Sequence, residues 1–114
     1  MLNVIKHRLD VWQIEPLYRE HMADIEKSIY SSTIQRSLFK ILRIRVSQIN
    51  KCVFCIDYHS EETLKHSETA HRMYLLSAWQ ESPLFTDIEK STLQLAEETT
   101  QISAHGYWMK PTRI

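Results

Sequence analysis

Residues 45–59 read RVSQINKCVFCIDYH and contain both cysteines of the chain. The apolar residues before it recur at spacings of three and four, which predicts a helix. That helix is expected to end at Asn50, because asparagine tolerates the left-handed backbone conformation better than most residues. A new helix is predicted to begin at about Lys51 or Cys52 and to run toward His66. The junction therefore places two cysteines in the first turn of a helix.

On the N-terminal side of the junction, the chain predicts two helices separated by a short break. Proline is favoured at the first helical position, so the first helix is expected to begin near Pro16. The run Ser31-Ser32-Thr33 interrupts its apolar stripe. Ser32 and Gln35 have the spacing of a capping box, which predicts the start of the next helix.

On the C-terminal side, two further helices are predicted. Ser67 is the expected N-cap of a helix that carries Trp79 among its apolar residues, and Ser82-Pro83 ends it, because proline cannot continue a helix interior. Thr86 and Glu89 form a second capping box and open the last helix. Its apolar residues Ile88, Leu95 and Ile102 are expected along one side.

The composition favours a single all-α domain. The chain has 114 residues and one glycine, where a β-rich fold would need glycines at its tight turns. Fourteen basic residues balance fourteen acidic ones, which argues against nucleic-acid binding through a basic face. No apolar run approaches the roughly 20 residues that span a bilayer, and the N-terminus lacks the pattern of a signal peptide. We therefore expect a cytoplasmic protein with no membrane partner.

The cysteine spacing indicates thiol redox chemistry. On a helix, Cys52, Cys55 and His59 fall on one side at spacings of three and four. A helix N-terminus and a cationic imidazole both lower a thiol pKa, and the thiolate is the reactive form. A second thiol lets an oxidised sulfur close to a disulfide before harsher oxidation. This cycle needs no organic cofactor and no metal.

The same two cysteines could also have a purely structural role. As a structural staple the pair would be weak, since so short a loop contributes only about 2 kcal/mol in the chain-entropy model. The two cysteines could be small buried apolar residues. A structural zinc site would need four ligands, which His59 and either His66 or His71 could complete. Haem attachment is excluded, because Ile56 stands where that pattern requires histidine.

The stretch 45–59 resembles the alkylhydroperoxidase AhpD-like branch of the carboxymuconolactone decarboxylase family, and residues 71–87, HRMYLLSAWQESPLFTD, resemble the next helix and turn of that family. The resemblance covers roughly residues 8–103. It implies an all-α AhpD-like helical bundle, with the CxxC motif at the N-terminus of a central helix, that assembles as a trimer or hexamer. Residues 1–114 would form one such domain, apparently shortened at the C-terminus, where Tyr107, Trp108 and Met109 are expected to cover apolar surface.

The resemblance also implies a hydroperoxide reductase. Cys55 would attack the peroxide. Cys52 would resolve the sulfenic acid, be the more exposed sulfur and meet the reductant, a protein dithiol or a dihydrolipoyl group. His59 would belong to the proton relay. The alternative is a non-catalytic or redox-sensing oligomeric member of the same family.

The chain departs from the family pattern at two positions near the motif. Lys40 stands twelve residues before Cys52, where the family commonly has the glutamate of the proton relay, and we hypothesise that Glu62 substitutes for it; the alternative is a solvated surface charge. Lys51 stands where the family usually has glycine, and Asn50 is expected to take the strained turn in its place.

Several residues outside the motif are predicted to have ordinary surface or core positions. The histidines His7, His21 and His105 are expected at the surface. The three tryptophans are expected in the core or in a subunit contact. Glu97 and Glu98 are expected on a solvated helix face.

Overall fold

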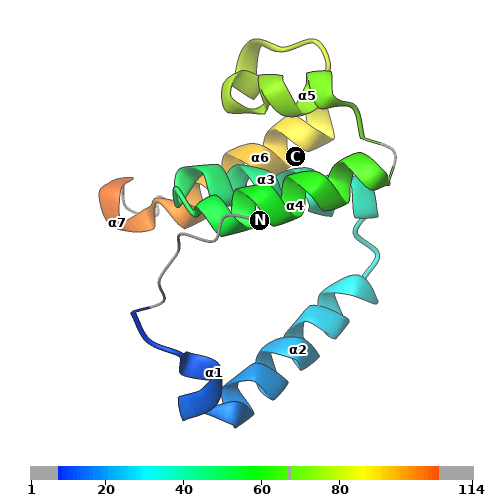
Figure 1. The fold of residues 1–114 in the computed structure, drawn as a ribbon. Helices are drawn as coiled ribbons and strands as arrows, with labels where there is room; N and C mark the ends of the chain where they lie inside the picture. Colours follow the sequence, from blue (N-terminus) through cyan, green and yellow to red (C-terminus); the bar gives the residue numbers. More distant parts are fainter. Residues whose placement is uncertain (1–7, 67, 106–114) are drawn as a thin grey trace. The chain divides into compact units, whose positions relative to one another are not determined.

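The computed structural model describes residues 8–66 and 68–105, and in this part of the chain all regular structure is helical (Figure 1). The predicted all-α fold is confirmed. The chain divides after Arg36 into two compact units. The single domain over residues 1–114 stays a prediction.

The first unit holds two helices, α1 (Val11–Ile14) and α2 (Pro16–Tyr30). Helix α2 begins at Pro16 as predicted, while the short α1 was not anticipated; the side chain of Asp10 caps it by accepting the N–H of Gln13 at 3.2 Å. The rings of Trp12 and Tyr18 stack at 5.5 Å between α1 and α2, yet both side chains stay exposed, so Trp12 is not in a core.

The break between α2 and the next helix differs from the predicted capping box. The hydroxyl of Ser32 donates to the carbonyl of Ile29 at 2.6 Å and accepts the N–H of Ile34 at 3.4 Å. The Ser32 side chain therefore bonds to the end of α2, whose Ile29 carbonyl also accepts the backbone N–H of Ser32 at 3.1 Å, and to Ile34 in place of Gln35. The predicted box is wrong, and α3 begins only at Arg36.

The second unit is a helical bundle around one apolar core. Its elements are α3 (Arg36–Ile49), α4 (Val53–Lys65), α5 (Ala70–Leu75), the 3-10 helix η1 (Leu76–Glu81), α6 (Asp87–Thr100) and α7 (Ile102–His105). Side chains from α3, η1, the loop before α6 and α6 itself make the core: Ile41, Ile44, Leu76, Trp79, Phe85 and Leu93. The core placement predicted for Trp79 is confirmed.

The segment after α4 starts and bends differently from the prediction. The N-cap of α5 is Thr69, whose hydroxyl accepts the N–H of Arg72; the predicted cap, Ser67, lies outside the described residues. Ala78 leaves the helical conformation at φ −130° and ψ 40°, so α5 and η1 form two short pieces and not one helix. The predicted end is confirmed, because η1 stops at Glu81, directly before Ser82 and Pro83.

Helix α6 begins at the predicted capping box. The hydroxyl of Thr86 accepts the N–H of Glu89 at 3.2 Å, and the Glu89 carboxylate accepts the N–H of Thr86 at 3.1 Å. The buried apolar residue of α6 is Leu93, whereas the residues predicted along its apolar side are exposed: Ile88, Leu95 and Ile102.

The side chain of Arg72 links α5 to the start of α6. Its guanidinium donates to the Glu89 carboxylate, to Glu68 at 3.2 Å and to the carbonyl of Leu84 at 2.9 Å, and it lies 4.9 Å from the ring of Phe85. Burial alone would raise the pKa of Glu89, but the hydrogen bonds from Arg72 and Thr86 prevail and hold that pKa below its ordinary value. Glu89 is therefore a charged, structural carboxylate at neutral pH.

Candidate active site

A left-handed residue connects α3 to α4. Helix α3 ends at Ile49, and Lys51 adopts φ 53°. The predicted helix end is confirmed, but the left-handed position was assigned to Asn50 and this was wrong. The tight connection lets the N–H of Cys52 donate to the carbonyl of Ser47 at 3.1 Å. The turn therefore ties the first cysteine to the last turn of α3, where Ser47 is buried.

Cys52 is the N-cap of α4. Its backbone is extended at φ −87° and ψ 98°, and its sulfur accepts the N–H of Cys55 at 3.2 Å. Cysteine here occupies the position that serine or aspartate usually takes, so the sulfur faces N–H groups that have no helical partner. The positive end of the helix dipole lies at the same place. Both features favour negative charge on this sulfur when it is reduced.

The two cysteines form a disulfide, with their Cα atoms 5.2 Å apart. The structure thus brings together the two sulfurs that the sequence predicted to cycle between dithiol and disulfide. Both residues are half-buried. The expectation that Cys52 is the more exposed one stays a prediction.

Burial along α4 shows which residues share a side. Cys52, Cys55 and His59 are half-buried and Thr63 is fully buried, at successive spacings of three and four. The hydroxyl of Thr63 donates to the carbonyl of His59 at 2.6 Å. Positions 52, 55 and 59 therefore share the inward side of α4. That the imidazole reaches the sulfurs stays a prediction. Glu62 follows His59 by three residues and is exposed.

Aromatic rings flank this side of α4. Phe54 and Tyr58 stack with ring centroids 6.2 Å apart, and the ring of Tyr58 meets that of His59 edge-on at 5.4 Å. The sequence interpretation overlooked this pair, although the i, i+4 spacing of two aromatic residues around Cys55 was a usable signal.

The residue in the position of the family glutamate is a half-buried lysine. Lys40 lies on α3, directly before the core residue Ile41. Ion pairs that the structure forms in residues 8–66 and 68–105 include Arg45 with Glu97, and Arg72 with Glu68 and Glu89. The position that supplies the relay glutamate in the resembling family thus carries a cation here.

A partly buried carboxylate contacts the second half of α3. Glu97 of α6 accepts the Nε–H of Arg45 at 2.7 Å and the indole N–H of Trp79 at 2.8 Å, both on Oε1, and Arg45 also donates to Gln48 at 3.1 Å. The side chains of Arg45 and Glu97 are only 17% and 19% exposed. The prediction that Glu97 lies on a solvated face is wrong.

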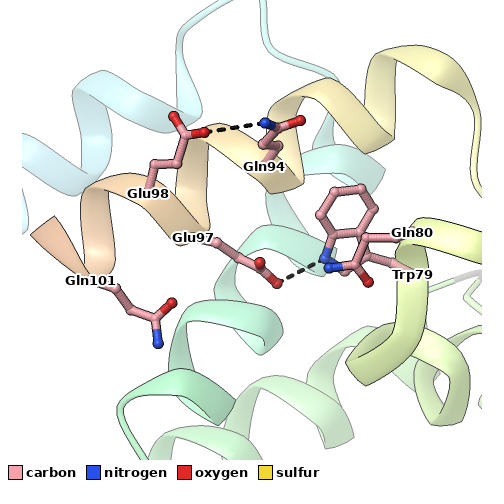
Figure 2. A pocket seen from close by; sticks show the side chains of 6 residues that line it. All are labelled: Trp79, Gln80, Gln94, Glu97, Glu98 and Gln101. Carbon is pink, nitrogen blue, oxygen red and sulfur yellow. Dashed lines mark hydrogen bonds between the residues drawn. The ribbon is translucent and has the colours of Figure 1, made fainter. Parts of the chain in front are cut away.

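Figure 2 shows the pocket beside this contact, an open hollow of about 440 Å³. Glu97 points at the Trp79 indole, and Gln94 donates to Glu98 at 3.1 Å. Polar side chains dominate its lining: Trp79, Gln80, Gln94, Glu97, Glu98 and Gln101. It contains neither a thiol nor an imidazole, and its buried carboxylate is already paired. The cysteine pair and His59 of α4 lie outside this pocket.

The sequence also singled out histidines and aromatic residues outside the motif. His21, His66 and His71 are exposed, while His7 and the side chain of His105 lie outside the described residues, as do Tyr107, Trp108 and Met109. Among residues 8–66 and 68–105, no three His, Cys, Asp or Glu side chains are grouped so as to hold a metal ion. Nor does any helix in that part of the chain combine the length and apolar character that a bilayer span requires.

Comparison with known proteins assigns the family. Residues 16–98 match the model of the carboxymuconolactone decarboxylase family. The uncharacterized protein YdfG of Bacillus subtilis (strain 168) is 39% identical over 98 residues, which cover 86% of this chain and 67% of YdfG. The uncharacterized protein YnjA of Escherichia coli (strain K12) is 30% identical over 57 residues, half of this chain and 31% of YnjA. The chain thus spans two thirds of one relative and under a third of the other.

A solved structure extends the comparison to the fold. It is that of ATU0492 from Agrobacterium tumefaciens, a protein of unknown function provisionally described as the antioxidant defence protein AhpD. The TM-score is 0.82 at 27% identity, over 91% of this chain and 71% of ATU0492. With the cysteine pair at the start of α4, these matches lead to one conclusion: the chain belongs to the carboxymuconolactone decarboxylase family, in its AhpD-like branch.

Proposed function

We propose that this protein is a thiol-dependent hydroperoxide reductase that acts in antioxidant defence, with Cys55 as the nucleophile. The observation that carries the proposal is the disulfide between Cys52 and Cys55 at the N-terminus of α4, with His59 on the same side of the helix. The likeness to ATU0492 adds support through the provisional description of that protein.

The first half of the cycle consumes the peroxide. The Cys55 thiolate attacks the terminal oxygen of ROOH, the O–O bond breaks, and Cys55 becomes a sulfenic acid while RO⁻ leaves. His59 holds the proton taken from the Cys55 thiol and returns it to RO⁻, which leaves as the alcohol ROH. The imidazole thereby serves first as base and then as acid.

The second half of the cycle closes and reopens the disulfide. Cys52 attacks the Cys55 sulfenic acid, hydroxide leaves and takes up the thiol proton as water, and the disulfide forms. The N-cap position supports this step, since the N–H of Cys55 that donates to the Cys52 sulfur stabilises a thiolate there. A protein dithiol or a dihydrolipoyl group then reduces the disulfide by exchange and is itself oxidised to a disulfide.

The oligomeric state is proposed from the family resemblance, and the cytoplasmic location from the sequence pattern. We propose a cytoplasmic homo-oligomer, a trimer or a hexamer, in which the thiol pair stores both electrons and no organic cofactor takes part. Sedimentation equilibrium measures the assembly directly.

Peroxide consumption by Cys55→Ser tests the proposal. With dithiothreitol as the reductant, we expect this variant to lose the turnover of the wild-type chain. Cys52→Ser, treated with peroxide in the absence of dithiothreitol, is the matched control: its Cys55 is oxidised once, detected as a sulfenic acid, but cannot form the disulfide. Peroxide consumption that survives in Cys55→Ser rules out the enzyme as drawn.

A second candidate function rests on Lys40. A half-buried cation where the resembling family has its relay carboxylate favours a slow, redox-sensing member that reports oxidation and does not turn over. We expect Lys40→Glu to speed peroxide-driven disulfide formation about tenfold or more, because positioned acid–base groups contribute about 10²–10⁴. If Glu62 serves as the substitute carboxylate, Glu62→Gln slows it. Unchanged rates in both variants would remove these two groups from the relay.

A further inference from the structure

We propose that α2 is an interface between two copies of this chain, in which an apolar stripe of the helix packs antiparallel against the same stripe of the second copy. The inference rests on the homo-oligomer of the proposed function and names the surface that forms it, but it does not depend on peroxide reduction. Four residues make the stripe: Tyr18, Met22, Ile25 and Ile29.

The first unit has no core of its own. Every described residue in it, 8–36, is exposed, whereas the second unit buries a cluster of apolar side chains. A helix of 15 residues such as α2 is marginal in water unless packing covers an apolar face. The pair of helices α1 and α2 (Figure 1) therefore needs a surface to pack against.

The spacing of the stripe is the same in both directions. Its residues follow one another at intervals of four, three and four, which places them on one side of the helix. When a second stripe runs antiparallel, Tyr18 lies opposite the partner's Ile29, and Met22 lies opposite the partner's Ile25. Each pair then occurs twice, as a two-fold axis requires.

The ring stack of the first unit favours the antiparallel arrangement. Trp12 of α1 stacks on Tyr18, with ring centroids 5.5 Å apart. Two parallel helices would bring both stacks to the same level, where they would compete for the same space. Antiparallel helices place each stack beside the other end of the partner helix, and their dipoles oppose each other.

The exposed apolar area fits a protein interface. The four stripe residues are 37–54% exposed, and six further large apolar side chains of the first unit are 40–63% exposed: Leu9, Val11, Trp12, Ile14, Leu17 and Ile34. With about 150 Å² for each fully exposed side chain, these ten offer roughly 750 Å². A standard interface takes about 800 Å² from each partner.

The charges of α2 argue against a lipid surface as the occupant. Helices that lie on membranes are rich in lysine and arginine on their polar side. Helix α2 has two basic residues against three acidic ones: Arg19 and Lys27, and Glu20, Asp24 and Glu26. Anionic lipid would therefore not attract this helix, whereas a second copy needs no net charge.

A two-fold contact restricts the size of the assembly. A ring of three copies has no two-fold axis, while a dimer or a hexamer built from two rings has one. The contact through α2 therefore selects an even number of copies.

Sedimentation equilibrium of Ile25→Glu tests the inference. We expect an even number of copies for the wild type, and a fall of the mass to half or less in Ile25→Glu, which buries two charges beside the axis. Ile88→Glu is the matched control: Ile88 is 70% exposed on α6, and the mass should stay that of the wild type. An unchanged mass in Ile25→Glu overturns the inference.

The mass of the wild type separates this inference from the proposed function. A trimer would overturn the two-fold contact and leave the homo-oligomer. A monomer would overturn both, and flotation with phosphatidylglycerol vesicles would then tell whether lipid covers the stripe. Neither result changes the test of peroxide consumption with Cys55→Ser.

Cross-linking tests the antiparallel register. Tyr18→Cys and Ile29→Cys are made in separate chains that also carry Cys52→Ser and Cys55→Ser, and the two chains are mixed and mildly oxidised. We expect a disulfide between Tyr18→Cys and Ile29→Cys, because the contact brings these positions opposite each other. Tyr18→Cys alone should not cross-link, since the two copies of position 18 lie about 16 Å apart along the helix. A missing mixed disulfide, or Tyr18→Cys linked to itself, overturns the inference.

Discussion

The proposed redox site begins with two adjacent residues, Lys51 and Cys52. Lys51 takes the left-handed turn, and Cys52 caps α4 with its sulfur. A side chain with a Cβ costs roughly 1–2 kcal/mol in the left-handed region, which glycine avoids. The chain therefore carries local strain one residue before the redox disulfide.

Lys51→Gly is expected to stabilise the oxidised protein by about 0.5–1 kcal/mol. Removing the strain gains more than the extra freedom of glycine costs in the unfolded chain. Urea denaturation of the oxidised protein measures the difference. Lys65→Gly is the control, because Lys65 lies in the helical last turn of α4 and glycine should destabilise there. A loss of stability in Lys51→Gly would contradict this account of the turn.

At the scale of the elements, the helices that hold the site are joined by ionic contacts between distant residues. Arg45 of α3 and Trp79 of η1 meet on Glu97 of α6, and Arg72 of α5 meets Glu89 of α6. The first of these contacts lies seven residues before Cys52. It fixes the end of the helix from which the site connection departs.

Glu97→Ala is expected to lower the free energy of unfolding by about 2 kcal/mol, since it leaves the partly buried guanidinium of Arg45 and the indole N–H of Trp79 without their acceptor. Chemical denaturation checks this. The neighbouring Glu98→Ala is the control and should cost below about 0.5 kcal/mol. Equal effects of the two substitutions would show that Glu97 has no special role.

The Arg72–Glu89 pair predicts a dependence of stability on pH. Because the pKa of Glu89 is held below its ordinary value of 4.5, the pair contributes fully above that pH and is lost as pH falls through the lower, folded-state pKa. Glu89→Gln keeps a side chain suited to the capping box but removes the charge. We expect the wild type to be about 2 kcal/mol more stable than Glu89→Gln at pH 7, and the gap to shrink below pH 4.5. Urea titrations from pH 7 to pH 3 measure the gap, and one that does not change with pH would contradict the ion pair.

Most helix starts could be predicted from residues close together in the sequence. Contacts between residues far apart in the sequence could not be predicted. Three helix starts were marked by local signals: Pro16, the Thr86–Glu89 capping box and the cysteines at the start of α4. Each signal involves residues at most four positions apart. The Ser32–Gln35 spacing failed because the Ser32 hydroxyl found a carbonyl at the end of α2. Glu97 was misjudged because Arg45, its partner, lies 52 residues away in the sequence.

For the molecule as a whole, sequence pattern, fold and comparison agree on the carboxymuconolactone decarboxylase family. The matched segment 16–98 contains α3, α4 and the redox disulfide, and the likeness to ATU0492 covers 91% of the chain. What the sequence did not reveal is the ring pair beside the cysteines and the ionic contacts that hold α3, both of which depend on side-chain placement. We propose that peroxide oxidises Cys55 and that the reaction ends in the Cys52–Cys55 disulfide.

A single-turnover titration tests that claim most directly. The protein is fully reduced, freed of reductant and mixed with one equivalent of cumene hydroperoxide, after which free thiols and alcohol are counted. We expect each chain to lose two thiols and to form one alcohol, and we expect mass spectrometry to map the disulfide to Cys52 and Cys55. Thiols that persist while the peroxide stays intact would contradict it.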